Sequence, residues 1–219
     1  MQADILWKAA VLTAMVFIGG IALGVWLDGQ RASQISAQTT DTDIRWNDAR
    51  LLSLYYQQLA GSGGAFCKFA LESNLAFNDK IYQEGLVLER YEAVNRFAPE
   101  LLQEKRRYAL LQFQFLLNSM ELKADCNASY HVLVYFYDHY NGGKEAVQNA
   151  QSQVLMELKN KCGGDLMLIP LPLDLDISSI SLLAAQHNIT SAPSILLDDK
   201  VFVGLTGKEK LIPLLGCGN

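Results

Sequence analysis

The sequence predicts an α/β protein: a four-stranded mixed sheet with flanking helices, preceded by a helical segment and one transmembrane helix. Three observations lead to this prediction. Residues 132–137 are a β-branched and aromatic run typical of a buried strand, and helix and strand patterns alternate after it. Residues 41–123 have the apolar spacing of helices. Residues 9–27 are nineteen positions without a charge.

Composition and net charge narrow the classes of partner. The 219 residues allow one or two domains with a substantial core. A formal net charge of −5 argues against nucleic acid or an anionic membrane surface as a main partner. The three histidines and four cysteines lack metal-ligand spacing. We therefore expect no nucleic-acid partner, no metal site and no cofactor.

The first element expected is a membrane anchor, residues 1–29, which would have the lipid bilayer as its partner through residues 9–27. At about 1.5 Å per residue this apolar run just crosses a hydrocarbon core of ~30 Å. Trp7 and Trp26 lie at its ends, where aromatic rings settle at the headgroup level. The alternative is a cleaved signal peptide, whose apolar region is shorter, about 7–15 residues. Residues 30–40, rich in Ser, Thr, Gln and Ala, are interpreted as a flexible tether.

Two further features of this segment leave alternatives open. Gly20 and Gly24 have the Gly-x-x-x-Gly spacing that lets two helices pack closely, so a homodimer through them is one hypothesis. Glycines are also common in transmembrane helices that do not dimerise, so the spacing does not require a dimer. Lys8 precedes the apolar run, and Arg31 and Arg45 follow it, so the positive-inside count is nearly balanced. These charges do not fix the orientation.

Residues 41–125 are predicted to form a helical hairpin or small bundle that packs on the domain that follows. A break is expected at residues 61–64, which contain three glycines. A separate second arm is expected over residues 78–97, and Pro99 suits the first turn of the last arm. Apolar and polar residues alternate at 111–115, as in a strand, so the helical pattern of this piece of the last arm is only moderate.

Residues 126–219 are predicted to form the α/β domain. Its first two strands are joined by a helix, so they should be parallel with a right-handed crossover. Asp198, Asp199 and Lys200 then suit a hairpin between the last two strands. In chain order we expect a strand at 132–137, a helix at 144–161, a strand at 166–171, a helix at 177–187, strands at 195–197 and 201–204, and a helix at 208–215.

Two local patterns in this domain resemble the thioredoxin superfamily. After the first strand, the residues from Tyr140 to Lys144 read Tyr-Asn-Gly-Gly-Lys, where thioredoxins have Trp-Cys-Gly-Pro-Cys. Ala192-Pro193, directly before the third expected strand, resembles the cis-proline turn of that family. The resemblance implies a thioredoxin-like fold for residues 126–219 and a cis peptide bond before Pro193.

The resemblance has a second implication, for function. Asn141 and Lys144 stand where the family has its two cysteines, so dithiol exchange is not expected and no catalytic residue is predicted. What the resemblance implies instead is a surface that pairs with the backbone of an extended peptide beside the cis-proline. We therefore expect a redox-inactive module that binds or positions a protein or peptide partner. The predicted peptide-binding surface comprises Tyr140, Asn141, Gly142, Gly143, Ala192 and Pro193.

The cysteines carry the alternative function and the prediction of compartment. The alternative is a thiol–disulfide oxidoreductase that uses Cys162 and Cys217. In the resembled fold, the helices before these two cysteines finish at one edge of the domain, which implies a Cys162–Cys217 disulfide. Cys67 and Cys126 would then pair with each other. Disulfides persist outside the cytosol, so we expect a single-pass membrane protein whose C-terminal domain lies on the extracytoplasmic side.

Overall fold

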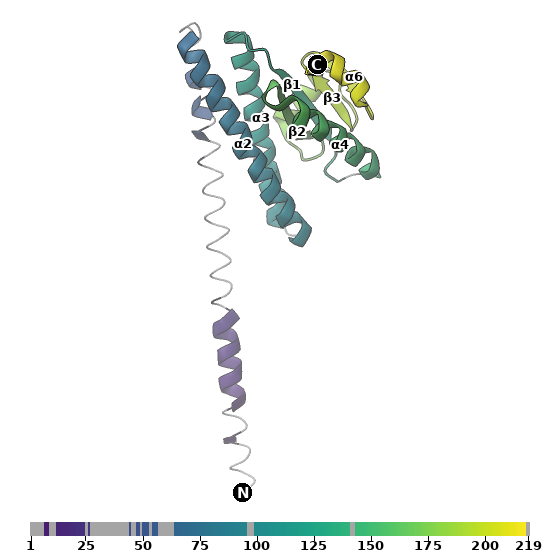
Figure 1. Cartoon of the computed structure of the whole chain (residues 1–219). Coiled ribbons are helices and arrows are strands. Elements are labelled where there is room, and N and C mark those ends of the chain that lie inside the picture. Colours follow the sequence, from purple (N-terminus) through teal and green to yellow (C-terminus); the bar gives the residue numbers. More distant parts are fainter. Residues whose placement is uncertain are drawn as a thin grey trace. The chain divides into compact units, whose positions relative to one another are not determined.

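The computed structural model describes residues 7–8, 12–24, 26, 44, 47–48, 50–52, 54–56, 64–95, 99–140 and 143–217 (Figure 1). The chain divides into two compact units, Met1–Arg45 and Trp46–Asn219. The predicted tether at residues 30–40 lies outside the described residues, and so does the predicted helix start at residues 41–43.

In the first unit, the prediction of a transmembrane helix at residues 9–27 is wrong for the helices that the structure describes. None of them is both long and apolar enough to cross a membrane. The continuous described stretch is residues 12–24, and at about 1.5 Å per residue these thirteen residues extend only ~20 Å, less than a hydrocarbon core. Residues 9–11, 25 and 27 of the predicted span lie outside the described residues.

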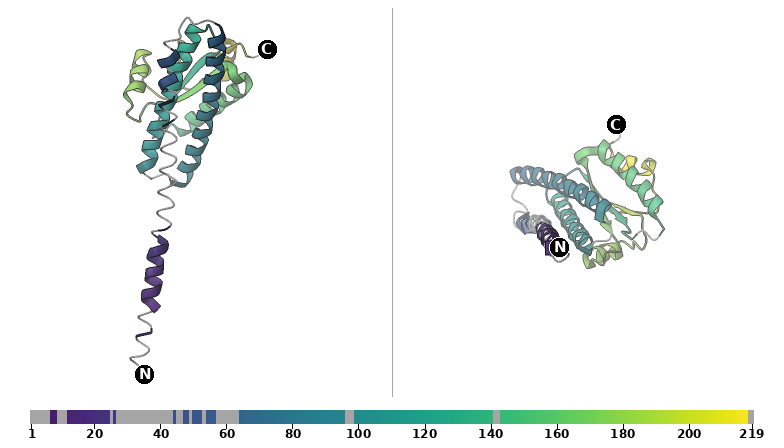
Figure 2. Two further views of the ribbon diagram at one scale, coloured as in Figure 1. Left: turned by 90° about the vertical axis from the view of Figure 1, so that its left-hand side faces the viewer. Right: turned by 90° about the horizontal axis from the view of Figure 1, so that it is seen from below.

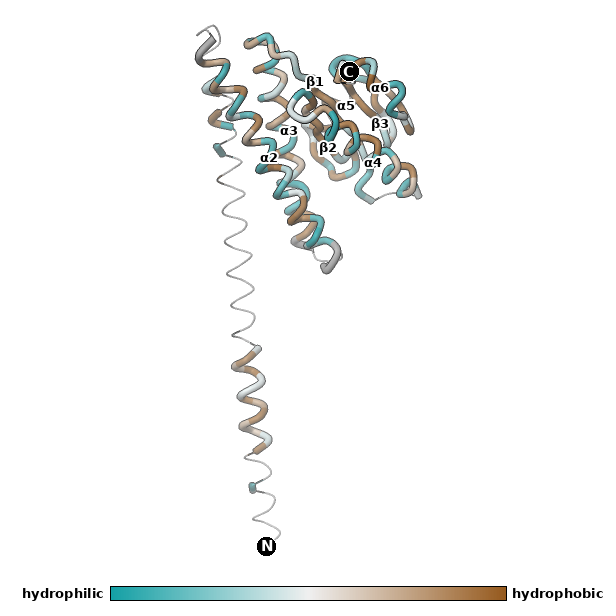
Figure 3. The backbone as a smooth tube through the Cα atoms, in the orientation of Figure 1, coloured by the Kyte–Doolittle hydropathy of each residue, from teal (hydrophilic) through white to brown (hydrophobic). Residues whose placement is uncertain are grey.

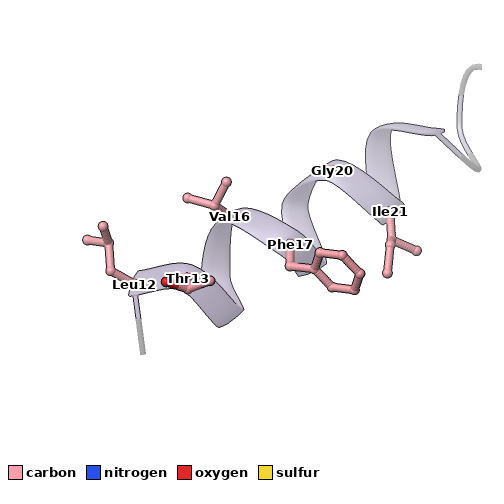
Figure 4. Close-up of a pocket in the computed structure, with 6 residues that line it drawn as sticks. All are labelled: Leu12, Thr13, Val16, Phe17, Gly20 and Ile21. Atoms are coloured by element: carbon pink, nitrogen blue, oxygen red, sulfur yellow. The ribbon is translucent and has the colours of Figure 1, made fainter. Parts of the chain in front are cut away.

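Figure 4 shows the residues along this helical stretch that line an open pocket. Its lining side chains all come from the one helix, so it is an open helix surface rather than an enclosed site. Gly20 and Gly24 have no atom within 4 Å of the position that a Cβ would take. The homodimer hypothesis for this pair stays a prediction. The lining residues are Leu12, Thr13, Val16, Phe17, Gly20 and Ile21.

The second unit contains the sheet and the helices around it (Figures 1 and 2). The predicted strands and helices of residues 126–219 are confirmed to within one or two residues at each end, because β-branched runs and glycine or proline turns delimit them clearly. In chain order the elements are α2 (Gly64–Asn95), α3 (Pro99–Asp125), β1 (His131–Tyr137), α4 (Glu145–Cys162), η1 (Gly163–Asp165), β2 (Leu166–Pro172), α5 (Ser178–Gln186), β3 (Ser194–Leu197), β4 (Lys200–Val203) and α6 (Lys208–Leu215).

The strands form one mixed sheet in the order β2-β1-β3-β4. β1 and β2 are parallel, as predicted from the helix that joins them, and His131 is aligned with Leu166. β3 is antiparallel to both β1 and β4. This arrangement, with helices on both faces, is compatible with the thioredoxin-like fold that the sequence resembles.

Alternate side chains of β1 enter two separate cores, because successive residues of a strand point to opposite faces. Val134 and Phe136 contribute to the core beneath α3 and α5. Leu133 and Tyr135 contribute to the core beneath α4 and α6. Figure 2 shows these two helix layers on either side of the sheet, and Figure 3 shows how strongly apolar the strands between them are.

The helices before β1 differ from the prediction in two respects. α2 is continuous from Gly64 to Asn95, so the separate second arm expected at residues 78–97 is wrong. Residues 111–115 lie within α3 and are helical, although they alternate like a strand. α2 and α3 share one core with the sheet, since Phe77 and Phe115 pack in the same cluster as the strand residues of that face.

Two disulfides close this unit, and both predicted pairings are confirmed. Cys67 bonds to Cys126 with a Cα separation of 5.4 Å, and Cys162 bonds to Cys217 with a Cα separation of 5.3 Å. Both separations lie within the range that disulfide geometry allows. Cys126 and Cys162 precede the first residues of β1 and β2, so both bonds lie at the amino end of these strands.

Asp198, at the β3–β4 turn, ties three elements together at that same end. Its carboxylate accepts hydrogen bonds from Lys123 Nζ at 2.6 Å, from His131 Nδ1 at 2.8 Å and from the Val132 N–H at 3.1 Å. Burial alone would raise the pKa of Asp198, but these hydrogen bonds outweigh it and hold the pKa below its usual value.

Replacing Asp198 by Asn, which tolerates the backbone φ of 50° there, is expected to lower the free energy of unfolding by about 1–2 kcal/mol at neutral pH. Because the pKa of Asp198 is lowered in the folded state, its ionised carboxylate stabilises the protein at pH values above the unfolded-state pKa of about 4. This stabilisation is lost as the pH falls from that value through the lower folded-state pKa. Urea titrations of both proteins at neutral pH and near pH 3 measure the difference. The exposed neighbour Asp199→Asn is the control, and an unchanged difference at low pH would contradict this role for the carboxylate.

Candidate functional site

The candidate site lies where β1 ends and β3 begins. Because these strands are antiparallel with Phe136 opposite Ser194, the residues after β1 and the residues before β3 meet at one end of the sheet. The peptide bond between Ala192 and Pro193 is cis, as predicted. The Pro193 carbonyl accepts a 2.8 Å hydrogen bond from the Gly204 N–H, which holds the turn against the end of β4.

Gln148, in the first turns of α4, holds the residue that follows β1. The Asp138 N–H donates to Gln148 Oε1 at 2.6 Å, and Gln148 Nε2 donates to the Asp138 carbonyl at 3.2 Å. The Tyr135 hydroxyl donates to the Gln148 backbone carbonyl at 3.2 Å. Lys144, just before α4, forms an ion pair with the Asp138 carboxylate at 2.9 Å. The start of α4 is therefore bonded to the end of β1 through side chains and backbone.

Asp174, in the loop after β2, fixes the next two residues. Its carboxylate accepts the N–H of His139 at 2.6 Å and the N–H of Tyr140 at 2.8 Å. The two rings lie with their centroids 4.9 Å apart, and Tyr140 is 65% exposed. The exposed ring of Tyr140 thus belongs to a residue whose backbone is held in place by the Asp174 carboxylate.

The helical hairpin reaches this site through Lys105 of α3. Its Nζ lies 2.5 Å from Glu92 Oε1 of α2 and 3.1 Å from His139 Nδ1. An ammonium group can only donate hydrogen bonds, so Nδ1 is the acceptor and we assign the ring proton to Nε2.

Ala192 contributes the backbone N–H and carbonyl that are available to a ligand at the site. Within the part of the chain that the structure describes, neither its N–H nor its carbonyl has a hydrogen-bond partner. Ala192 is 6% exposed, and backbone groups this close to the interior are nearly always paired. An unpaired donor and acceptor on one residue at a strand end are what the backbone of an extended chain would satisfy.

The predicted surface residues are only partly accounted for. Tyr140 is exposed and follows β1 at this end of the sheet, and Ala192 and Pro193 form the cis turn. Gly143 has a φ of 85°, which glycine adopts without strain. Asn141 and Gly142 lie outside the described residues. Their part in peptide binding stays a prediction.

Sequence reasoning missed Gln148 and Asp174, the two residues that hold the site. A pattern for Gln148 was available, because the buried residues of α4 recur at intervals of three and four and its first two positions are glutamines. A polar residue at the start of an otherwise apolar helical stripe indicates a specific partner there. No comparable pattern distinguishes Asp174 from the other acidic residues near it. The buried residues of α4 are Gln148, Gln151, Leu155, Leu158 and Cys162.

The cysteines are far from this site. β1 has seven residues, so its amino end, where both disulfides lie, is about 20 Å from its carboxyl end. All four cysteines are in disulfides. Cys162 is buried and closes α4, and the negative end of a helix dipole disfavours a thiolate there.

Neither the described side chains nor the comparisons with known proteins add a further group to the site. Among the described residues, no cluster of three or more His, Cys, Asp and Glu side chains is arranged to hold a metal ion. No protein-family model matches the chain, and no curated protein is significantly similar to it.

Proposed function

We propose that this protein is a redox-inactive, thioredoxin-like module that binds an extended segment of a partner protein along the backbone of Ala192. The observation that carries the proposal is that the N–H and carbonyl of Ala192 have no hydrogen-bond partner among the residues that the structure describes, at the end of β1 and beside a cis-proline. The sheet order and the helices on both faces support a thioredoxin-like fold. The exposed ring of Tyr140 supplies apolar contact area at the same end of the sheet.

The arrangement of the cysteines supports the redox-inactive part of the proposal. Thiol exchange requires an accessible thiolate, and thiolates form most readily at a helix N-terminus. The residue before α4 is Lys144, whose Nζ is paired with Asp138, and it offers no sulfur. Two disulfides and no free thiol favour an extracytoplasmic compartment.

Strand addition predicts an alternating effect of backbone methylation in the ligand. Peptides selected from a random library on the full chain would be resynthesised with one N-methyl group at each position in turn. Methylating the residue that faces Ala192 removes one hydrogen bond, so its affinity is expected to fall about tenfold. Methylating either neighbour, whose N–H points away from the turn, is the control and is expected to change the affinity little. Titration calorimetry measures both.

Two results would contradict this binding mode. One is a uniform effect of methylation along the peptide, which would indicate recognition of side chains only. The other is a selected peptide that leaves the amide resonance of Ala192 unchanged in a titration followed by nuclear magnetic resonance.

The oxidoreductase alternative predicts catalysis, and our proposal predicts none. The full chain is expected to reduce insulin no faster than the reductant alone, because both disulfides lie away from the site. The variant Cys162→Ala/Cys217→Ala is the control. Turnover by the unmodified chain that disappears in this variant would support the oxidoreductase instead.

A further inference from the structure

We propose that Asn127 and Asn188 are attachment sites for N-linked glycans. Each asparagine begins an Asn-x-Ser/Thr triplet, which is the acceptor sequence for this modification. The sequence contains the triplet at two places, Asn127-Ala128-Ser129 and Asn188-Ile189-Thr190. Both sites are independent of peptide binding at Ala192.

The structure places both triplets in the same kind of helix ending. After α3, the Ala128 N–H donates to the Lys123 carbonyl at 3.2 Å. After α5, the Ile189 N–H donates to the Ala184 carbonyl at 2.8 Å. Each bond reaches back five positions, as in the Schellman motif that closes many helices. The asparagine of each triplet precedes the donor and has a left-handed φ, 48° in the first triplet and 55° in the second.

This ending directs the middle residue of each triplet inward and the other two outward. Ile189 is buried in the core beneath α3 and α5, and Ala128 packs against the same core. Among the described residues, none of the four outward side chains has a hydrogen-bond partner. The amide that would be modified and the hydroxyl that completes the acceptor triplet are therefore accessible at both sites. The four exposed residues are Asn127, Ser129, Asn188 and Thr190.

The helix ending accounts for the asparagines but not for the hydroxyl residues. Asparagine adopts a left-handed conformation more readily than most residues, which suits the position after a helix. Nothing in this motif requires Ser or Thr two positions later. Asn74 and Asn118 offer a comparison, because both are buried and neither has a hydroxyl residue two positions later. The triplet thus occurs at exposed asparagines and is absent from these buried ones.

The two disulfides favour the compartment in which this modification takes place, since both belong outside the cytosol. The co-reactant is an oligosaccharide joined through phosphate to a membrane lipid, and a separate transferase catalyses the step. The asparagine Nδ2 forms a bond to the anomeric carbon of the sugar, while the bond from that carbon to the phosphate oxygen breaks. The lipid phosphate leaves with the electron pair, and Nδ2 gives up one proton to a base of the transferase.

The test is mass spectrometry of the full chain, expressed in cells whose secretory pathway carries out N-glycosylation. An amidase that removes N-linked glycans converts each occupied asparagine to aspartate. We expect this conversion at Asn127 and Asn188 in the treated sample and not in an untreated one. The buried Asn74 and Asn118 are the control and are expected to stay unchanged in both samples.

Substitutions at Thr190 separate recognition of the triplet from an effect on folding. Thr190→Val keeps the shape of the side chain and removes the hydroxyl, so the glycan at Asn188 is expected to be lost while that at Asn127 remains. Thr190→Ser keeps the hydroxyl and is expected to retain both glycans. Because Thr190 is exposed, the circular dichroism spectra of the variants are expected to match that of the unmodified sequence.

Two results would overturn the inference. One is a chain without glycans in which both disulfides have formed, because the domain then reached an oxidising compartment without being modified. The other is a chain without glycans whose thiols are free, because the domain then remained in the cytosol, away from the transferase. A chain that carries both glycans but binds no peptide would contradict the proposed function alone.

Discussion

Replacing Cys162 and Cys217 together by alanine is expected to lower the free energy of unfolding by about 4 kcal/mol. The disulfide joins residues 55 positions apart, and closing a loop of that length removes entropy from the unfolded chain by about this amount in the chain-entropy model. Alanine is preferred to serine because Cys162 is buried among apolar side chains. Urea denaturation followed by circular dichroism measures the loss, and the dependence on urea should steepen because the unfolded chain exposes more surface.

The other disulfide is the internal comparison for this experiment. Cys67 and Cys126 are 59 positions apart, so removing that bond is expected to cost nearly the same. A loss below about 1 kcal/mol for the Cys162 and Cys217 pair alone would contradict the entropic account for that bond.

The sheet could be predicted from the sequence because its strands follow simple patterns. β1 is an uninterrupted β-branched and aromatic run, and its burial on both faces agrees with such a run. The turn at Ala192-Pro193 and the hairpin at Asp198 are marked by residues with restricted or special backbone preferences. In each of these places one local rule decides the structure.

The helices could not be delimited in the same way, because polar residues occupy buried positions in them. Asn74 interrupts the apolar stripe of α2, yet it is buried and donates to Ser119 of α3 at 3.0 Å. Gln112 makes residues 111–115 alternate like a strand, yet it is buried and donates to the Tyr108 hydroxyl at 2.7 Å. Their partners are set by tertiary packing, so the sequence pattern alone could not show them.

The candidate site was difficult for the same reason. The residues beside the cis-proline were predicted from local motifs. Gln148 and Asp174 act through contacts with backbone groups 10 and 34–35 positions away, which no local motif specifies. The transmembrane prediction failed for a different reason. It depended on the absence of charged residues over residues 9–27, whereas the continuous helix that the structure describes covers only residues 12–24.

Phe115→Ala is expected to lower the free energy of unfolding by about 3–5 kcal/mol, the usual cost of removing a buried phenylalanine ring. Phe115 of α3 is 1% exposed and packs edge-on against Phe77 of α2 with ring centroids 6.0 Å apart. The same core contains strand residues, so we expect the helical hairpin and the sheet to unfold together.

The matched control for this prediction is Phe69→Ala in α2. It removes the same ring from a position that is 69% exposed, so we expect a loss within about 0.5 kcal/mol. Hydrogen exchange of α2, α3 and β1 under mild denaturant follows each element separately. In Phe115→Ala all three should become less protected by a similar factor, because they share one core. Loss of protection confined to α2 and α3 would instead indicate that the hairpin folds as a domain of its own, with a boundary near residue 125, and that the contacts between α3 and the sheet contribute little to the stability of β1.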